Sequence, residues 1–195
     1  MVNNRTRSIL FSVGGLMLYV IGSYTLVFAT FALFILAWLL GDWKNWKKYY
    51  PTILFPILLD FFCSILTYEH GLWLFEKSLF IPNHTITDFY ITFLHFPPKV
   101  LIYLSLYPYK SPLFKQLAYI TIWVVGNSLI EYFFVLTNIT TYHNGWNFWW
   151  SVLVWSMMFP LLRLHHTKPL WAWLVSLGFT IFIIIYFDLP ITKLK

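Results

Sequence analysis

Three acidic residues of this chain stand inside long apolar runs, where a charge is costly. The 195 residues include only 7 Asp and Glu, and Asp60, Asp88 and Glu131 lie within such runs. A charged side chain near the centre of a membrane-spanning helix costs about 2.5–3.5 kcal/mol on insertion scales. These acids therefore need partners, and they are the first candidates for a functional site.

Other polar residues on the same runs recur at helical spacing. Asn127 precedes Glu131 by four residues, and Asp60 precedes Ser64 by four. A third stripe follows intervals of four, four, three and four: His84, Asp88, Thr92, His95 and Lys99. Side chains at such spacings share one helix face. We therefore expect three helices to present polar faces to a common cluster, with His143 of a polar loop beside it.

Such a cluster supports functions of two classes. A non-catalytic protein would use it to bind or conduct a small solute, a lipid or a proton, or to hold a membrane-protein partner, through a cavity open to the extracytoplasmic side and lined by Asp60, Asp88, His95 and Glu131. The alternative is a membrane-embedded hydrolase or transferase for lipid-linked substrates. Glu131 or Asp60 would then be the general base and His95 the acid, within about 3 Å of one reacting atom. We expect the non-catalytic role.

A structural explanation of the same acids competes with both functions. An uncharged Asp or Glu that pairs with Asn, Tyr, His or Lys locks helix packing and needs no ligand. His84 and Asp88, at i and i+4, are also spaced to ligate zinc, but no paired-His signature accompanies them. We expect no metal and no cofactor. The chain has no phosphate loop, no GxSxG motif and no nucleic-acid motif, so we expect no nucleic-acid partner.

The composition is that of a membrane protein. Hydrophobic residues make up 59% of the chain and charged residues 10%. The mean hydropathy of +0.69 is spread over the whole length, so no soluble domain is left over. The single cysteine, Cys63, excludes an internal disulfide. We predict one all-α integral membrane domain over residues 1–195.

Apolar runs of about 20 residues mark the helices that would cross the bilayer. Five form a core over residues 51–187, separated by short polar connections: 51–68, 86–106, 116–137, 148–164 and 169–187. The connection at 69–85 is amphipathic and is expected along the interface. Residues 8–40 are too long for one upright span, so a tilt, a turn at Gly22-Ser23 or a cleavable signal peptide are all open. We predict six spans, with seven as the alternative.

A pair of prolines and a glycine should shape these helices. Pro97 and Pro98 remove backbone donors. The helix over 86–106, which is the third span when residues 8–40 are counted as the first, should therefore break there. A break inside a membrane is tolerated only where it faces protein or water. His95 and Lys99 flank it and should point into the bundle with Asp88, so that the break forms the floor of the cavity. Gly126 should allow a neighbouring helix to approach closely.

Basic residues predict the orientation of the core. The loops around 43–48, 107–115 and 163–168 carry seven Lys and Arg, against three on the opposite side. The positive-inside rule makes the first set cytoplasmic and the 142–147 loop extracytoplasmic. Within the first set, the Arg163-Leu164-His165-His166 motif could contact phosphate or lipid headgroups, although a cationic helix terminus on the cytoplasmic side is the commoner explanation. Aromatic residues, 23% of the chain, cluster at the predicted boundaries as interfacial belts do.

Several distinctive motifs occur along the chain: GDWKNWKKYYPTILF at 41–55, IPNHT at 81–85, IEY at 130–132, YHNGWNFWWS at 142–151, and MFPLLRLHH followed by KPLWAW. They resemble an uncharacterised family of small polytopic membrane proteins of endospore-forming Gram-positive bacteria. The similarity covers about residues 36–190. It implies a multi-pass protein of the bacterial cytoplasmic membrane, and it transfers no catalytic residue.

Overall fold

The protein is an all-helical bundle with one very small sheet. The computed structural model describes residues 4–190, with side chains from residue 13 onward. Its elements follow the predicted order: α1 (Asn4–Leu40), the 3-10 turn η1 (Trp43–Asn45), α2 (Trp46–Leu66), β1 (Trp73–Phe75), α3 (His84–Leu94), α4 (Phe96–Ser105), α5 (Leu113–Leu136), β2 (Thr140–Tyr142), α6 (Phe148–Thr167) and α7 (Pro169–Tyr186).

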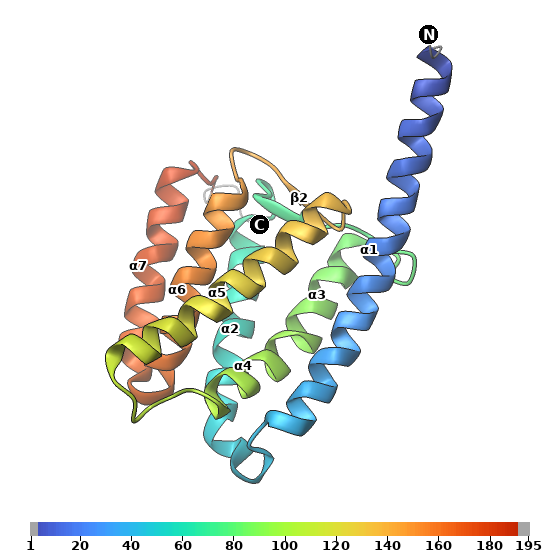
Figure 1. The fold of residues 1–195 in the computed structure, drawn as a ribbon. Coiled ribbons are helices and arrows are strands. Elements are labelled where there is room, and N and C mark those ends of the chain that lie inside the picture. The colour runs from blue at the N-terminus through green and yellow to red at the C-terminus, as the bar shows by residue number, and fades with distance from the viewer. Residues whose placement is uncertain (1–3, 191–195) are drawn as a thin grey trace.

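The helices pack side by side around an aromatic core. α6 contacts α2, α5 and α7, while α4 contacts α1 and α2. α5 runs obliquely across one face of the bundle, with α7 at one flank and α1 at the other (Figure 1). The largest buried side chains of the main core are Tyr103, Phe55 and Phe159, and the rings of Tyr103 and Phe159 lie 5.1 Å apart. The core therefore joins α2, α4 and α6.

Four helical segments are long and apolar enough to cross a membrane, by length and composition. They are Val13–Leu40, Trp43–Leu66, Leu113–Leu136 and Pro169–Tyr186. α6 and the pair formed by α3 and α4 do not meet the same criteria, because α6 is more polar and α3 and α4 are each short. The all-helical fold is confirmed, and these four helices are compatible with a membrane protein.

α1 is one continuous helix, so the turn considered at Gly22-Ser23 is absent. A Cβ atom on Gly22 would lie 2.5 Å from Thr137 Oγ1 and 2.7 Å from Ile139 Cγ1. The Ser23 hydroxyl accepts a hydrogen bond of 3.2 Å from the Leu79 backbone N–H. The two small residues therefore allow close packing rather than a bend. N-terminal to this contact, α1 runs on beyond the rest of the bundle (Figure 1).

The glycine predicted to allow close approach is not used in that way. No atom outside the local helix backbone lies within 4 Å of the Cβ position of Gly126. Gly22 of α1 serves this purpose instead, because the chain leaving α5 passes directly over it. Helical spacing alone could not distinguish the two glycines.

The predicted break at the proline pair is confirmed. α3 ends at Leu94 and α4 begins at Phe96, with His95 between them. Pro97 and Pro98 occupy the first turn of α4, where a missing N–H group leaves no hydrogen bond unmade. At its other end α3 is capped by Asn83, whose side chain accepts a 2.9 Å hydrogen bond from the Ile86 N–H.

The connection at 69–85 folds onto the end of the bundle and contains one strand of the small sheet. β1 pairs with β2 in antiparallel register, with Trp73 opposite Tyr142 and Phe75 opposite Thr140. Leu72 and Ile81, on either side of β1, are buried. Long-range strand pairing has no local signature in so short a segment, so the sequence did not predict the sheet. We call this end of the molecule the hairpin end.

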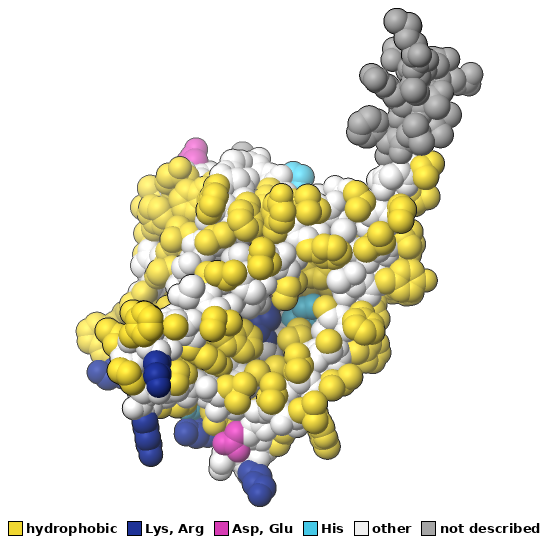
Figure 2. All heavy atoms as spheres, viewed as in Figure 1, with side chains coloured by type: hydrophobic (Ala, Val, Ile, Leu, Met, Phe, Trp, Pro, Cys, Tyr) yellow, Lys and Arg dark blue, Asp and Glu magenta, His cyan; other side chains and the backbone are white. Residues whose placement is uncertain are grey.

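The opposite end of the bundle carries most of the positive charge. Figure 2 shows Lys and Arg side chains gathered there, where the α1–α2, α4–α5 and α6–α7 connections lie. We call it the basic end, and its cations are Lys44, Lys47, Lys48, Lys110, Lys115, Arg163 and Lys168. The three connections that charge counting assigned to one side of the membrane thus lie at one end of the bundle.

Candidate functional site

Asp60 and Asp88 lie where α2 packs against α3. The Thr92 hydroxyl on α3 donates a hydrogen bond to Asp60 Oδ2. In return, the Ser64 hydroxyl on α2 donates a 3.0 Å hydrogen bond to Asp88 Oδ2. Each carboxyl group is therefore held by a hydroxyl from the other helix. This crossed pair ties α2 to α3 without needing a ligand.

His95 is buried at the break between α3 and α4 and faces α1. Its Nε2 atom lies 2.7 Å from Thr30 Oγ1, and the Tyr90 hydroxyl donates a 2.7 Å hydrogen bond to the same oxygen. Only 7% of the His95 surface is exposed. The side chain points into the bundle, as predicted, but its hydrogen-bond partner is the Thr30 hydroxyl of α1 and not an acid.

Glu131 is held by two donors from other elements. Tyr142 of β2 donates a 2.7 Å hydrogen bond to Oε1, and the Trp155 indole of α6 donates a 2.6 Å hydrogen bond to Oε2. Glu131 therefore lies within the bundle and connects α5 to α6 and to the sheet. Both carboxylate oxygens have a hydrogen-bond partner. These hydrogen bonds offset the free-energy cost of removing the carboxylate from water.

A chain of hydrogen bonds continues from Glu131 into the hairpin end. The Trp146 indole donates to Ser151 Oγ at 3.0 Å, and the Ser151 hydroxyl donates to the Tyr142 oxygen at 3.2 Å. Burial raises the pKa of Tyr142 well above its ordinary value, and the Glu131 carboxylate raises it further. Tyr142 therefore keeps its proton near neutral pH and remains a donor to Glu131.

Lys99 lies against aromatic rings. Its Nζ atom is 4.7 Å from the centre of the Trp155 ring and 5.8 Å from that of Phe96. Among the described residues no carboxylate oxygen forms an ion pair with Lys99 within 4.0 Å. Trp155 thus receives the cation on its face and donates from its edge to Glu131. Figure 2 shows basic and histidine side chains at the floor of a hollow halfway along the bundle, between α5 and α1.

The three remaining candidates lie apart from these contacts. Asn127 is buried and donates a 2.8 Å hydrogen bond to the Trp123 carbonyl of its own helix. His143 is exposed at the hairpin end, 2.9 Å from Thr141 Oγ1. His84 begins α3 and is exposed. Of the eight candidate residues, all but Lys99 and His84 thus have a side-chain hydrogen bond, and these contacts form several local groups.

One apolar cavity lies between α2, α6 and α7. It has a volume of about 150 Å³, and its lining is almost entirely apolar, with Phe55, Leu59, Met157, Phe179 and Ile183 among the wall residues. Asp60 is the only carboxyl group that lines it. Asp88, His95 and Glu131 are absent from its wall. This corrects the prediction that the four polar residues line one shared cavity. The acids instead accept hydrogen bonds from hydroxyl and indole groups of neighbouring elements.

Several partners had no signal in the sequence. Thr30 and Trp155 stand in apolar runs, and each bonds a group on another helix. A further pair, Thr52 of α2 and His165 of α6, is buried, with Oγ1 and Nδ1 3.0 Å apart. A lone Thr or Trp in an apolar run is unremarkable by composition. Only the rotational setting of neighbouring helices identifies its partner.

The described residues contain no group of three or more His, Cys, Asp or Glu side chains placed to hold a metal ion. The absence of a cofactor stays a prediction. Searches of protein-family models, curated proteins and solved structures found no match to this chain. Function must therefore be argued from the geometry alone.

Proposed function

We propose that this protein is a six-span membrane protein of the bacterial cytoplasmic membrane. The four long apolar helices supply four spans, and α6 and the α3–α4 pair supply the other two. Support for α6 comes from its position, because α2, α5 and α7 all contact it. Together α3 and α4 reach from His84 to Ser105, which at 1.5 Å per residue is about 30 Å, the thickness of the hydrocarbon core.

Its orientation places the basic end in the cytoplasm and the hairpin end outside. The Lys and Arg asymmetry between the two ends supports this assignment. Both the beginning of α1 and the end of α7 then lie on the extracytoplasmic side, as an even number of crossings requires (Figure 1). The likeness to proteins of endospore-forming bacteria supports the choice of membrane.

Its function is to bind the hydrocarbon chain of a lipid or a similar amphiphile, without catalysis. The observation that carries this proposal is the apolar cavity of about 150 Å³ between α2, α6 and α7. An apolar cavity of this size stays dry and accepts apolar molecules. It holds a segment of one chain and not a whole lipid. The surrounding bilayer supplies chains at high concentration beside the exposed faces of α2 and α7.

The wall of the cavity on α7 has helical spacing. Ser176, Phe179, Thr180 and Ile183 follow one another at three, one and three residues, and all line the cavity. The hydroxyls of Ser176 and Thr180 donate to backbone carbonyls of their own helix, at 2.8 and 2.9 Å, so they offer few polar contacts to a ligand. The wall is therefore suited to a chain, and Asp60 marks the one place where a ligand hydroxyl could be received.

Local pairing disfavours the enzyme alternative. A general base and acid must reach one reacting atom. The Asp60 carboxyl group meets Thr92, His95 meets Thr30, and Glu131 meets Tyr142 and Trp155. His95 and Glu131 do not line the cavity that Asp60 lines.

Spin-labelled stearic acid in nanodiscs of neutral phospholipid tests the proposal. Electron paramagnetic resonance separates a restricted, protein-bound fraction of the label from the mobile bulk. Thr180→Phe places a ring inside the cavity, and Ile181→Phe, at an exposed neighbouring position of the same helix, is the matched control. We expect the restricted fraction to fall several-fold in Thr180→Phe and to be unchanged in Ile181→Phe.

The opposite result is equally clear. If both variants retain the restricted fraction of the wild type, the chain binds elsewhere and the cavity is only a packing defect. Unchanged gel-filtration profiles of both variants would show that folding is intact.

A further inference from the structure

The basic end holds far more positive than negative charge. Asp42 is the only acid in its connections, beside seven Lys and Arg. Asn45 donates hydrogen bonds to both carboxylate oxygens of Asp42, and Tyr49 donates one to Oδ2. The hydrogen bonds from Asn45 are the largest cause of the lowered pKa of Asp42. This acid is therefore ionised and already occupied by its neighbours.

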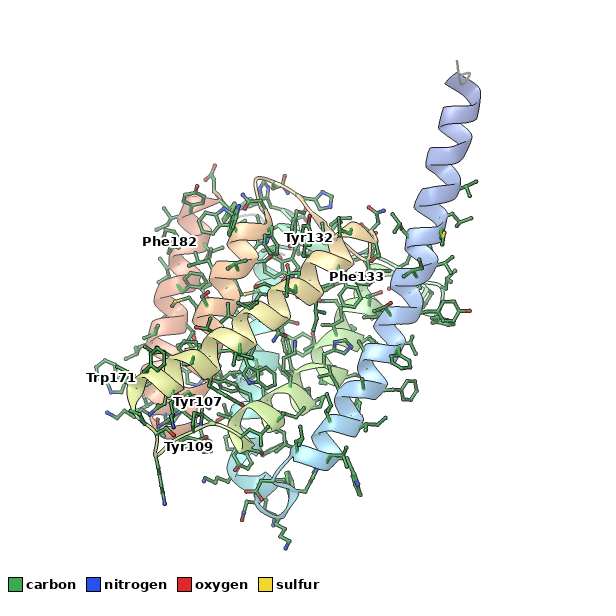
Figure 3. All side chains as sticks on the ribbon, viewed as in Figure 1. Tyr107, Tyr109, Tyr132, Phe133, Trp171 and Phe182 are labelled. Atoms are coloured by element: carbon green, nitrogen blue, oxygen red, sulfur yellow. The ribbon has the colours of Figure 1, made fainter. Side chains whose placement is uncertain are left out.

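Arg163, near the end of α6, is held by aromatic rings and has no acid beside it. Its guanidinium carbon lies 4.7 Å from the centre of the Tyr109 ring and 5.3 Å from that of Tyr107. Figure 3 shows both tyrosines at this end, near the start of α5. Nη1 donates a 3.0 Å hydrogen bond to Thr167 Oγ1, but Nε is buried with no partner. No carboxylate of the described residues forms an ion pair with Arg163.

The tyrosine hydroxyls around Arg163 make no hydrogen bond to it and donate elsewhere. The Tyr107 hydroxyl donates to Gln116 at 2.9 Å, and the Tyr109 hydroxyl donates to the Leu104 carbonyl at 3.1 Å. Burial raises the pKa of Tyr109 to about 12, although Arg163 opposes this shift. Both tyrosines thus present their ring faces to the guanidinium. These faces fix the plane of the guanidinium group and leave one donor edge unused.

His166 adds a second nitrogen without a partner at the same end. Its ring stacks on Tyr49 with centroids 5.3 Å apart and lies 6.0 Å from the Tyr109 ring. Its Nδ1 atom is buried without a hydrogen bond. Lys48 lies over the Tyr49 ring of this stack, with its Nζ atom 5.7 Å from the ring centroid. Arg163, His166 and Lys48 thus surround a framework of three tyrosine rings.

Helix ends at the basic end also lack acceptors. α2, α5 and α7 begin there, and none has a side-chain hydrogen bond from its N-cap residue, Asn45, Pro112 and Lys168 respectively. The first N–H groups of a helix carry a partial positive charge and attract anions. These helix N-termini therefore add to the positive electrostatic potential that the Lys and Arg side chains of the basic end produce.

We propose that Arg163, with His166 and Lys48, binds the phosphate group of an anionic phospholipid at the basic end. A guanidinium group held in one plane by aromatic rings can donate two parallel hydrogen bonds to two oxygens of a phosphate group. A histidine N–H and a lysine ammonium can donate to the remaining phosphate oxygens. Phosphate offers acceptors to the guanidinium and imidazole groups, whose Nε and Nδ1 atoms are buried without a hydrogen bond among the described residues. The proposal is independent of the cavity between α2, α6 and α7.

Native mass spectrometry of protein released from nanodiscs tests the site. The discs contain phosphatidylglycerol and phosphatidylcholine in equal amounts, and the readout is the ratio of the two lipids that stay bound. We expect the wild type to retain phosphatidylglycerol several-fold over phosphatidylcholine. Arg163→Gln should reduce this preference about ten-fold, as the loss of a charge-assisted contact predicts. Arg163→Lys should reduce it partly, because charge remains but the fork is lost.

A matched control separates a built site from general surface charge. Lys168→Gln removes one charge from an exposed residue at the same end. It should change the preference by less than two-fold. Equal losses in Arg163→Gln and Lys168→Gln, or no preference in the wild type, would overturn the proposal. His166→Phe keeps the stack on Tyr49 and should lower the preference, while Thr180→Phe in the cavity should leave it unchanged.

A second arm identifies the source of the phosphate group. Inorganic phosphate is titrated into protein in a phosphate-free, uncharged detergent, with thermal unfolding as the readout. Stabilisation at millimolar phosphate that Arg163→Gln abolishes would support the site and assign it to free phosphate as well. Stabilisation by phosphatidylglycerol alone would support the site and assign it to lipid. Stabilisation by neither would overturn it.

Discussion

The two ends of the bundle satisfy their polar groups in opposite ways. At the hairpin end, α3 and α6 begin with Asn83 and Asn147, and both side chains accept a first-turn N–H. At the basic end, α2, α5 and α7 begin without such caps. Glu131, toward the hairpin end, has two donors, whereas Arg163 at the basic end has a buried Nε without an acceptor.

The difference indicates where this molecule needs outside contacts. Most polar groups toward the hairpin end have partners within the protein, and the buried Thr140 Oγ1 atom of β2 is an exception. At the basic end the buried Arg163 Nε and His166 Nδ1 atoms have no partner, and lipid headgroups are rich in acceptors. The acids that drew attention in the sequence thus have hydrogen-bond partners within the protein, and we propose the basic residues as the better candidates for binding.

Labelling of single cysteines should give the largest effect. It tests whether the two ends of the bundle lie on opposite sides of the membrane. In a Cys63→Ser background, Asn144→Cys at the hairpin end should react with an impermeant maleimide in intact cells. Lys110→Cys at the basic end should react only after the membrane is permeabilised. The expected contrast is all or none, and the reverse pattern would place the basic end against the outer leaflet.

Removing the Glu131 carboxylate should cost the most stability. Glu131→Leu leaves the Tyr142 hydroxyl and the Trp155 indole without an acceptor, and each buried orphan costs about 1–3 kcal/mol. We expect a total loss of about 3 kcal/mol in the free energy of unfolding. Unfolding in mixed micelles of dodecyl maltoside and sodium dodecyl sulfate, followed by tryptophan fluorescence, measures it.

Glu131→Gln is the matched variant, because its amide oxygen can accept one of the two hydrogen bonds. Its loss should be about 1 kcal/mol. If Glu131→Leu is as stable as the wild type, the hairpin end is not satisfied in the way described. The contrast between the two ends would then disappear.

The sequence predicted the elements well and their contacts poorly. The five core helices lie near their expected ranges, and the break at Pro97-Pro98 is present, because apolar run length and proline chemistry are local properties. Asp60, His95 and Glu131 were correctly expected to need partners. Which partners they found depends on helix rotation and on residues far away in the chain, as the contact between His95 and Thr30 shows.

The glycines illustrate the same limit. Gly22 and Gly126 each lie in an apolar run, and only Gly22 meets another segment closely. The partner of Gly22 is the chain after α5, more than a hundred residues further on, which no local pattern identifies. The small sheet was missed for the same reason, since β1 and β2 are each three residues long and distant in sequence.

Adding one methyl group at Gly22 should be the next largest effect. In Gly22→Ala the new Cβ would clash with Thr137 and Ile139 at less than 3 Å, so α1 or the chain leaving α5 must shift. Overpacking of this kind costs about 1–3 kcal/mol. Gly126→Ala has open space and gains helix propensity, so it should be neutral or more stable by up to about 1 kcal/mol. Equal effects at both positions would contradict the close contact of α1.

The smallest effect compares helix starts at the two ends. The Asn147 side chain accepts a 3.0 Å hydrogen bond from the Trp149 N–H, so Asn147→Ala should lower the free energy of unfolding by about 1 kcal/mol. Asn45 occupies the same position before α2 but makes no cap hydrogen bond. Its amide bonds the exposed Asp42 carboxylate instead, so Asn45→Ala should change stability by less than about 0.5 kcal/mol. Both variants are measured in the same micelle titration. A loss in Asn45→Ala as large as that in Asn147→Ala would mean that the start of α2 is capped after all, and the basic end would then have one vacant donor group fewer to offer a phosphate.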